Sequence, residues 1–306
     1  MRRCVRCCGR CRVGVPEGRA CLSVANVPTV LLTMSAVQVP VPQQMPPESA
    51  PEGVLLVDKD PGFTSHNAVA LCRRILQTKK VGHCGTLDPM ATGLLMVVVG
   101  RATKLQERLM CEDKEYTATL KLGIETNSQD ADGEVVAVRP TDGLTEEAVR
   151  GAFAHFLGAF DQVPPMFSAV KINGVPCYKL ARKGRDVERK ARHVQVFDFE
   201  IGRMDLAAGE VDFRVHCSKG FYVRTYAHDI GQLLGCGAHL TALRRTRSGC
   251  FRVEDAITVP ELKAGTRGEL LARLLPVEKV LADRAEAGAL SPGGVPGSGQ
   301  GAENAR

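Results

Sequence analysis

Tryptophan is missing from the sequence, aromatic residues make up only 5% of it, and no apolar run approaches the roughly eighteen residues that a membrane span requires. The sequence also has no glycine-rich phosphate-binding loop of the kinds found in nucleotide-dependent enzymes. These absences argue against a membrane protein and against a nucleotide-dependent enzyme. With 306 residues and 44% hydrophobic content, the chain is long enough to bury one or two cores, and we expect a soluble protein.

The formal net charge of +6 is unevenly distributed. Residues 1–33 contain six arginines against Glu17 alone, so the remainder of the chain is close to neutral. A proline- and glutamine-rich stretch follows Met34, and we predict that residues 1–53 form a disordered leader. An arginine-rich, acid-poor segment also resembles an organellar transit peptide, and translation from Met34 is the other alternative. We expect a cytoplasmic location, or an organellar one if the leader is a transit peptide.

Five of the twelve cysteines fall within residues 1–33, and the other seven are scattered without paired spacing. Such scatter is typical of reduced, intracellular thiols. The run CVRCCGRC could form a zinc knot through Cys4, Cys7, Cys8 and Cys11, but a tetrahedral site usually draws its ligands from a folded unit, and the sequence predicts none there. We expect no metal.

From residue 54 the sequence shows the strand and helix patterns of an α/β (α+β) domain. Strands are predicted at residues 54–58, 94–99 and 116–122, and again at VQVFDFEI and VDFRVHC. Helices are predicted after Thr64 or Ser65, over residues 145–158, and at TYAHDIGQLLG. Strands and helices do not alternate strictly, so we expect a mixed, largely antiparallel central sheet flanked by helices. The predicted domain covers residues 54–283, and residues 284–306 are predicted to be a disordered tail.

The segment GHCGTLDPMATG, residues 82–93, carries the strongest chemical signal. Its glycines, proline and threonine predict a loop held by the strand that follows, which is a common way to present a catalytic side chain. Asp88 lies at the tip of this loop. Taken alone, Asp88 could simply begin the turn before Pro89, as Asp-Pro often does.

The wider sequence resembles the TruB-type tRNA pseudouridine synthases, whose hallmark is a G-H-x-G-x-L-D-P-x-A-T-G loop with the aspartate as catalytic residue. Residues 82–93 match that loop at every fixed position. Five further blocks match in order and spacing across roughly three quarters of the chain. They are LLVDKDPGFTSH (55–66), LGIETNSQDADGE (122–134), PPMFSAVKINGVPCYKLARKG (164–184), CSKGFYVRT (217–225) and GCGAHLTALRR (235–245).

The resemblance implies a pseudouridine synthase fold and the isomerisation of a uridine to pseudouridine in the T stem-loop of tRNA. The reaction cleaves the bond from ribose C1′ to uracil N1, turns the base, and rejoins it through C5. Because no redox change or group transfer occurs, no cofactor and no metal are expected. Asp88 is the expected essential carboxylate, acting either as a nucleophile or as a base. We expect a monomer with tRNA as its partner.

The resemblance also implies the other site residues. Arg224 is the expected cation that keeps the buried Asp88 charged. Tyr116 is expected to stack on the flipped base, and Tyr222 is expected to be a second tyrosine of the pocket. Leu243 is expected to make an apolar contact with the substrate. Read without the family, Tyr116, Tyr222 and Leu243 would be ordinary core residues.

Two further positions have expected roles near the loop. His83 matches a family histidine that lies beside the flipped nucleotide, although a lone histidine in a loop is more often structural. Lys59 is expected to orient the catalytic loop.

Residues 171–192 contain eight Lys or Arg against Asp186 and Glu188, a local net charge of +6. Such a segment is an electrostatic footprint for phosphates, and the family places a flexible thumb here, at about residues 165–193. The alternative is a solvated helix face with ordinary salt bridges. The expected contacts to the RNA backbone are Lys183, Arg185, Arg189 and Lys190. Arg244, Arg245 and Arg247 are expected to extend this surface.

Two other functions compete with this interpretation. Many family members continue into a PUA-type RNA-binding domain, whereas the sequence after residue 283 is of low complexity, so we expect that domain to be absent. A guide-RNA-dependent pseudouridine synthase normally needs such a domain. A non-catalytic RNA-folding protein would not require a carboxylate among phosphates, so the presence of Asp88 argues against it.

Overall fold

The computed structural model describes residues 50–290, with side chains to residue 286. The leader sequence up to residue 49, with its CVRCCGRC run, and the tail from residue 291 lie outside the described residues. The last described helix continues to Leu290, past the boundary that we expected at residue 283. No helix within residues 50–290 is long and apolar enough to cross a membrane.

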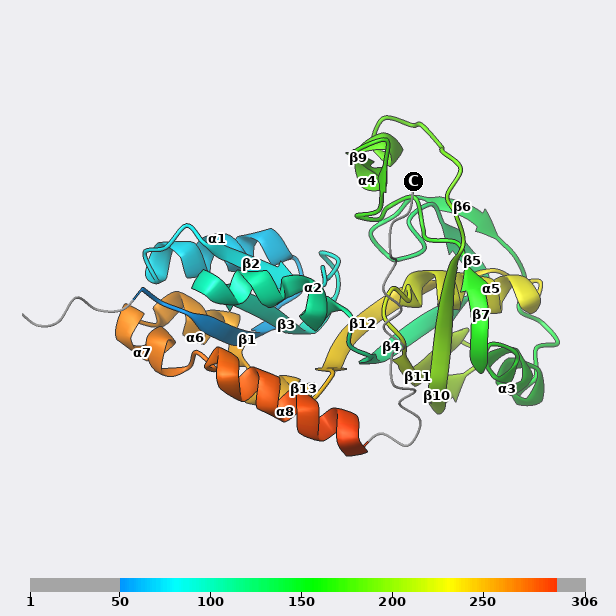
Figure 1. The fold of residues 1–306 in the computed structure, drawn as a ribbon. Coiled ribbons are helices and arrows are strands. Elements are labelled where there is room, and N and C mark those ends of the chain that lie inside the picture. Colours follow the sequence, from blue (N-terminus) through cyan, green and yellow to red (C-terminus); the bar gives the residue numbers. More distant parts are fainter. Residues whose placement is uncertain (1–49, 291–306) are drawn as a thin grey trace, which may run out of the picture. The chain divides into compact units, whose positions relative to one another are not determined.

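The fold centres on a ten-stranded mixed sheet (Figure 1). Its main order is β14-β1-β3-β12-β4-β11-β10-β7, with β2 added to β3 and β13 to β12. Pairing is antiparallel except between β1 and β14 and between β12 and β3, which confirms the expected fold class. The strands are β1 (Gly53–Lys59), β2 (Val81–Cys84), β3 (Thr92–Val99), β4 (Lys114–Leu122), β7 (Gly158–Gln162), β10 (Arg192–Asp205), β11 (Glu210–Cys217), β12 (Ala238–Ser248), β13 (Phe251–Arg252) and β14 (Ile257–Thr258).

Two short hairpins stand outside the main sheet. One pairs β5 (Ile124–Thr126) with β6 (Val135–Val138), and the other pairs β8 (Lys171–Ile172) with β9 (Val175–Pro176). The second hairpin and helix α4 (Cys177–Ala181) form the segment between β7 and β10, at the position expected for the thumb (Figure 1).

Four helices, α1, α3, α6 and α7, begin at a threonine whose side chain caps the first turn. The side chains of Thr64 and Thr145 accept hydrogen bonds from the first turns of α1 and α3. Thr258 and Thr266 form capping boxes with Glu261 and Glu269 at α6 and α7. The remaining helices and 3-10 turns complete the chain. The bounds are α1 (Ser65–Ile75), η1 (Gly100–Leu105), α2 (Gln106–Met110), α3 (Glu146–His155), α5 (Val223–Leu233), η2 (Val253–Asp255), α6 (Val259–Ala264), α7 (Arg267–Ala272) and α8 (Val277–Leu290).

The sheet is covered differently along its width. Strand β3 is buried on both faces. On one face Leu95, Val97 and Val99 pack in a core with residues of α1 and α5. On the other face Leu94, Met96 and Val98 pack in a second core with Val280 of α8. Strands β4 and β11 alternate instead, with Tyr116, Ala118 and Leu120 facing the first core. Their opposite face is polar, so this half of the sheet has one open side.

Strand β12 joins the two halves of the sheet because it pairs with both β3 and β4. Its register against β4 shifts twice, between Leu240 and Ala242 and again between Arg245 and Arg247. At the junction with β3, Gly93 has a φ of +97°, and a Cβ atom there would lie 2.2 Å from the Arg245 carbonyl oxygen. Only glycine therefore permits the two strands to approach this closely.

We predict that Gly93→Ala destabilises the protein more than a positive φ alone would. Gly143 is a matched control, because its φ is +83° and a Cβ atom there would meet nothing within 4 Å. Gly143→Ala should cost about 1–2 kcal/mol from backbone strain. Gly93→Ala should cost roughly 1–3 kcal/mol more, because the strands must move apart. Urea unfolding of the two variants checks this, and equal losses would contradict the proposed close approach.

Candidate active site

The loop between β2 and β3 is held in place by the chain segment that follows β1. Lys59 is fully buried, and its Nζ donates hydrogen bonds to the carbonyl oxygens of Asp60 at 2.9 Å and Pro89 at 3.1 Å. The Gly62 amide also donates to Pro89, at 2.8 Å. Ser65 Oγ accepts from the Leu87 amide at 3.0 Å. These contacts fix the residues on both sides of Asp88 and agree with the expectation that Lys59 orients the loop.

Burial changes the acidity of Lys59 despite the carboxylates nearby. Removal from water lowers its pKa to about 8, while Asp88 and Asp60 act in the opposite direction. A buried ammonium group is tolerated here because it donates to two carbonyl oxygens and lies in the field of Asp88.

Asp88 forms an ion pair with Arg224, the cation expected from the sequence. Arg224 Nε donates to Asp88 Oδ2 at 2.9 Å, and it also lies 3.5 Å from Asp130 Oδ2. The other guanidinium nitrogens donate to the carbonyl oxygens of Ser128 at 2.7 Å and Phe167 at 2.8 Å. Arg224 is 3% exposed, so these contacts use a guanidinium group that is almost out of water.

The ion pair lies in a cavity of ≈ 320 Å³. The walls include four of the residues expected to act around Asp88, namely Tyr116, Tyr222, Arg224 and Leu243. Tyr222 is fixed by Gln162 of β7, whose side chain accepts from the Tyr222 amide at 2.8 Å and donates to its carbonyl oxygen at 3.1 Å. Segments from β4, β12, α5 and the catalytic loop thus converge on one space.

His83 is the expected residue that does not line this cavity. It lies on β2, where its ring packs edge to face on His66 with 5.7 Å between centroids. Its Nδ1 atom is buried without a hydrogen-bond partner. Burial lowers the pKa of His83 to about 4, so the ring is neutral at physiological pH. The role that the resemblance implies for His83 stays a prediction.

Several residues near Asp88 were not foreseen from the sequence. Asp130 belongs to a DADG stretch that predicted only a turn, yet its carboxylate is the second partner of Arg224. Lys114, Ser168 and Arg192 line the cavity, and Ser168 Oγ is buried without a partner. Lys114 Nζ donates to the carbonyl oxygens of Met110, at 2.9 Å, and Glu112. A strand pattern shows which side of a sheet a residue faces but not which cavity it borders.

Burial also raises the pKa of both cavity tyrosines. The pKa of Tyr116 rises to about 12, and that of Tyr222 rises as well. Both phenols therefore keep their protons at neutral pH and can donate hydrogen bonds. Lys114 shows the opposite effect, since burial lowers its pKa to about 8.

The basic segment is exposed beside this cavity. Lys183, Arg185 and Lys190 are exposed, whereas Arg189 is partly buried and lies 3.6 Å from Asp186. Arg192, at the end of the segment, lines the cavity itself. Basic side chains of this segment are therefore found both at exposed positions and at the wall of the cavity.

The described part of the chain contains no group of three or more His, Cys, Asp or Glu side chains placed to hold a metal ion. The polar lining of the cavity comprises one carboxylate clamped by a guanidinium, two protonated phenols and several buried cations. Such a set suits nucleophilic or acid–base chemistry on a small planar group.

Comparison with known proteins places the chain among pseudouridine synthases. Residues 73–223 match the TruB family pseudouridylate synthase N-terminal domain, and residues 224–282 match the tRNA pseudouridylate synthase B C-terminal domain. The chain is 52% identical to tRNA pseudouridine synthase B of Opitutus terrae over 231 residues, which are 76% of this chain and 95% of that protein. It is 46% identical to tRNA pseudouridine synthase B of Ralstonia pickettii over 250 residues, 81% and 78% of the two chains.

Solved structures show the same fold. A Cbf5-Nop10-Gar1 complex contains a chain that is 32% identical with a TM-score of 0.58, over 76% of this chain and 63% of that one. An H/ACA RNP bound to a substrate RNA containing 2'-deoxyuridine contains a chain that is 28% identical with a TM-score of 0.55, over 76% and 62%. The present chain thus spans less than two thirds of these matched chains.

The contacts of Arg224 generate a prediction about stability. Arg224→Met leaves both Asp88 and Asp130 without a cation at ion-pair distance, and because Asp130 is buried, the free energy of unfolding should fall by roughly 3–5 kcal/mol. Adding Asp130→Asn removes the uncompensated buried charge and should recover part of this loss. Urea unfolding at neutral pH provides the measurement. A double variant no more stable than Arg224→Met would show that charge compensation is not what Arg224 supplies.

Proposed function

The chain belongs to the TruB family of pseudouridylate synthases, and we propose that it converts a uridine in the T stem-loop of tRNA to pseudouridine. The observation that carries this proposal is the Asp88–Arg224 ion pair inside a cavity walled by Tyr116. The names of the curated relatives, at 46–52% identity, support tRNA as the substrate.

The cavity suits a base that has left its stack. A stacked uridine does not present its glycosidic bond, so the nucleotide must be flipped out and held against a flat face. Tyr116 and Tyr222 offer aromatic rings, and Leu243 offers an apolar contact. A volume of ≈ 320 Å³ is at the small end of the range for small-ligand pockets, as a single base requires.

Asp88 is the group placed to begin the chemistry. Its side chain is 31% exposed, so an incoming nucleotide can reach it, while Arg224 holds it from behind. A carboxylate in this position can act as a nucleophile or as a base at the sugar, and either role needs the charged form. The hydrogen bond from Arg224 Nε holds the carboxylate in this position.

The exposed lysines and arginine of the basic segment would contact phosphates of the stem. They position the RNA without reading its bases, so the choice of uridine rests on the cavity and on the shape of the loop. A guide-RNA-dependent activity is the second candidate, because chains in H/ACA complexes share the fold. Identity to those chains is 28–32%, against 46–52% for the tRNA enzymes, which favours the tRNA activity.

Asp88→Asn tests the proposed chemistry. The change removes a charge that does chemistry but contributes little to phosphate contacts, so turnover should disappear while tRNA affinity stays within a few-fold. Release of tritium from C5-labelled uridine in a tRNA transcript measures turnover, and mapping of the product identifies the uridine. Substantial pseudouridine formation by Asp88→Asn would refute the role of this carboxylate.

Replacement of Lys183, Arg185 and Lys190 by glutamine tests the proposed RNA surface. Binding to tRNA should weaken, and the log-log dependence of affinity on salt should flatten by about one for each lost phosphate contact. A control variant with Lys121, Arg150 and Arg203 replaced changes the net charge equally, but these side chains form ion pairs away from the cavity. The same salt slope in both variants would show that the basic segment faces only solvent.

A further inference from the structure

Two neighbouring arginines of β12 have opposite surroundings. Arg244 forms a bidentate pair with Asp58, at 3.0 and 2.7 Å, and is partly exposed. Arg245 is 2% exposed and is among the largest fully buried side chains of the described chain. Our expectation that Arg245 extends the RNA-binding surface is therefore wrong, because its guanidinium group points inward.

The polar contacts of Arg245 are not to carboxylates. Its Nε donates to the Leu94 carbonyl oxygen at 2.7 Å, and its Nη2 donates to the Gly85 carbonyl oxygen at 3.2 Å. No carboxylate within the described residues lies at ion-pair distance from Arg245. Gly85 and Leu94 lie near the two ends of the catalytic loop, so this guanidinium group clamps the loop at both sides.

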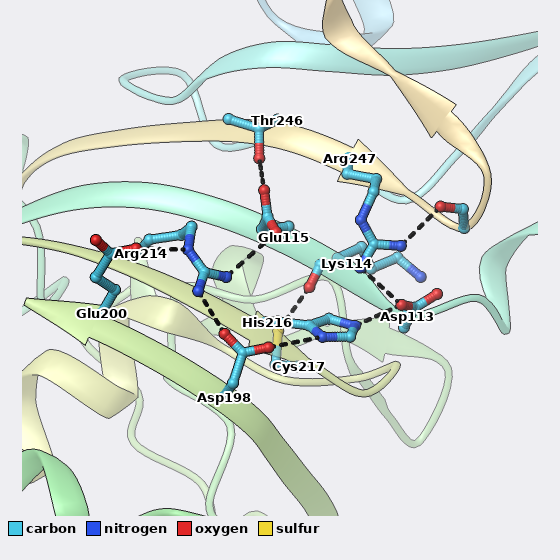
Figure 2. Close-up of polar contacts among 11 residues, drawn as sticks. Asp113, Lys114, Glu115, Asp198, Glu200, Arg214, His216, Cys217, Thr246 and Arg247 are labelled. Atoms are coloured by element: carbon cyan, nitrogen blue, oxygen red, sulfur yellow. Dashed lines mark hydrogen bonds and ion pairs between the residues drawn. The ribbon is translucent and has the colours of Figure 1, made fainter. Parts of the chain in front are cut away.

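An arginine on the other face of the same sheet has the carboxylate partners that Arg245 lacks. Figure 2 shows Arg214 of β11 surrounded by carboxylates, with distances of 3.3 Å to Glu115, 2.5 Å to Asp198 and 3.4 Å to Glu200. Arg214 is partly exposed, so water screens it further. Arg245 is 2% exposed and has no carboxylate of the described residues at ion-pair distance, and burying a charge in that way costs free energy. The cost points to a role in the cavity that Arg245 lines.

Tyr116 shares that cavity with Arg245. Arg245 is the direct cross-strand neighbour of Tyr116 in the β12–β4 pairing, and both side chains line the cavity. The positive charge of Arg245 acts on the phenol and opposes the effect of burial on its pKa. A guanidinium group has only donors, so in a contact between the two groups the phenol oxygen is the acceptor. The phenol hydrogen can then be donated to a group in the cavity.

We propose that Arg245 is a positioning residue, which fixes the Tyr116 hydroxyl as a hydrogen-bond donor toward the uracil base and supplies positive charge behind it. The inference rests on the proposed function. When the bond from N1 to C1′ breaks, its electron pair stays on the base, so the detached uracil carries negative charge. The new bond from C5 to C1′ then uses a ring electron pair, C5 loses its proton, and N1 gains one. A donor backed by a cation stabilises the base while it is negative.

The electrostatic surroundings agree with this geometry. Burial raises the pKa of Tyr116 to about 12, and Arg245 is the main group that opposes the rise. The same charge lowers the pKa of Lys114 and, to a smaller extent than burial and His66, that of His83. The field of Arg245 thus reaches the groups around the cavity as well as the phenol.

A double-mutant cycle tests the proposal with the full chain and a tRNA transcript. Arg245→Lys keeps the charge but cannot reach the phenol and two carbonyl oxygens at once, and Tyr116→Phe removes only the hydroxyl group. Each should lower kcat about 10- to 100-fold, somewhat less than the loss of a direct oxyanion donor, with KM within a few-fold. The double variant should lose less kcat than the product of the two single losses, because both changes remove the same interaction. Arg214→Lys, on the other face, should leave kcat unchanged.

The possible results distinguish a failure of the proposed function from a failure of the positioning role of Arg245. A wild-type chain that forms no pseudouridine in tRNA overturns the proposed function itself. An active wild type whose two kcat losses multiply in the double variant overturns only the positioning role, because Arg245 would then act on the loop independently of the hydroxyl. Should Arg245→Lys fail to fold by circular dichroism, Tyr116→Phe alone decides, and an unchanged kcat for that variant overturns the proposal.

Discussion

The ion pair between Asp88 and Arg224 is the interaction on which the site depends. Arg224, in the first turn of α5, donates to Asp88 Oδ2 at 2.9 Å and fixes the carboxylate at the wall of the cavity. The same guanidinium group binds the carbonyl oxygens of Ser128 and Phe167, from the turn after β5 and from the segment that leads into β8. One side chain therefore fixes the positions of Asp88 and of two segments that are distant from it in the sequence.

Much of the fold could be predicted from local pattern. Alternation in residues 116–122 and in VDFRVHC correctly predicts strands with one buried face. The helices predicted after Thr64 or Ser65 and over residues 145–158 are also present, although the second ends at His155. The mixed, largely antiparallel sheet also followed, because strands and helices do not alternate strictly. Asp88, Tyr116, Tyr222, Arg224 and Leu243 were identified by a motif rather than by pattern, and the structure brings them to one cavity.

The remainder of the site depends on tertiary geometry that local sequence does not encode. Asp130 does lie in a turn, as predicted, but only the position of α5 directs Arg224 toward its carboxylate. His83 matches the motif as well as Asp88 does, yet its place on β2 keeps it from lining the cavity. Arg244 and Arg245 form a doublet of one residue type, and composition cannot tell the surface cation from the buried one. That difference depends on strand register.

The first register shift of β12 decides which arginine enters the cavity. Leu240 faces the core, and strict alternation from it would turn Ala242 and Arg244 inward as well. The shift between Leu240 and Ala242 inserts one residue, so Leu243 and Arg245 face inward instead. A regular strand of the same length would instead turn Arg244 toward the cavity and Arg245 toward solvent, whereas deleting the inserted residue would restore regular pairing and leave Leu243 and Arg245 facing inward. The inserted residue, and not the pairing of the strand alone, therefore determines which of the two arginines lines the cavity.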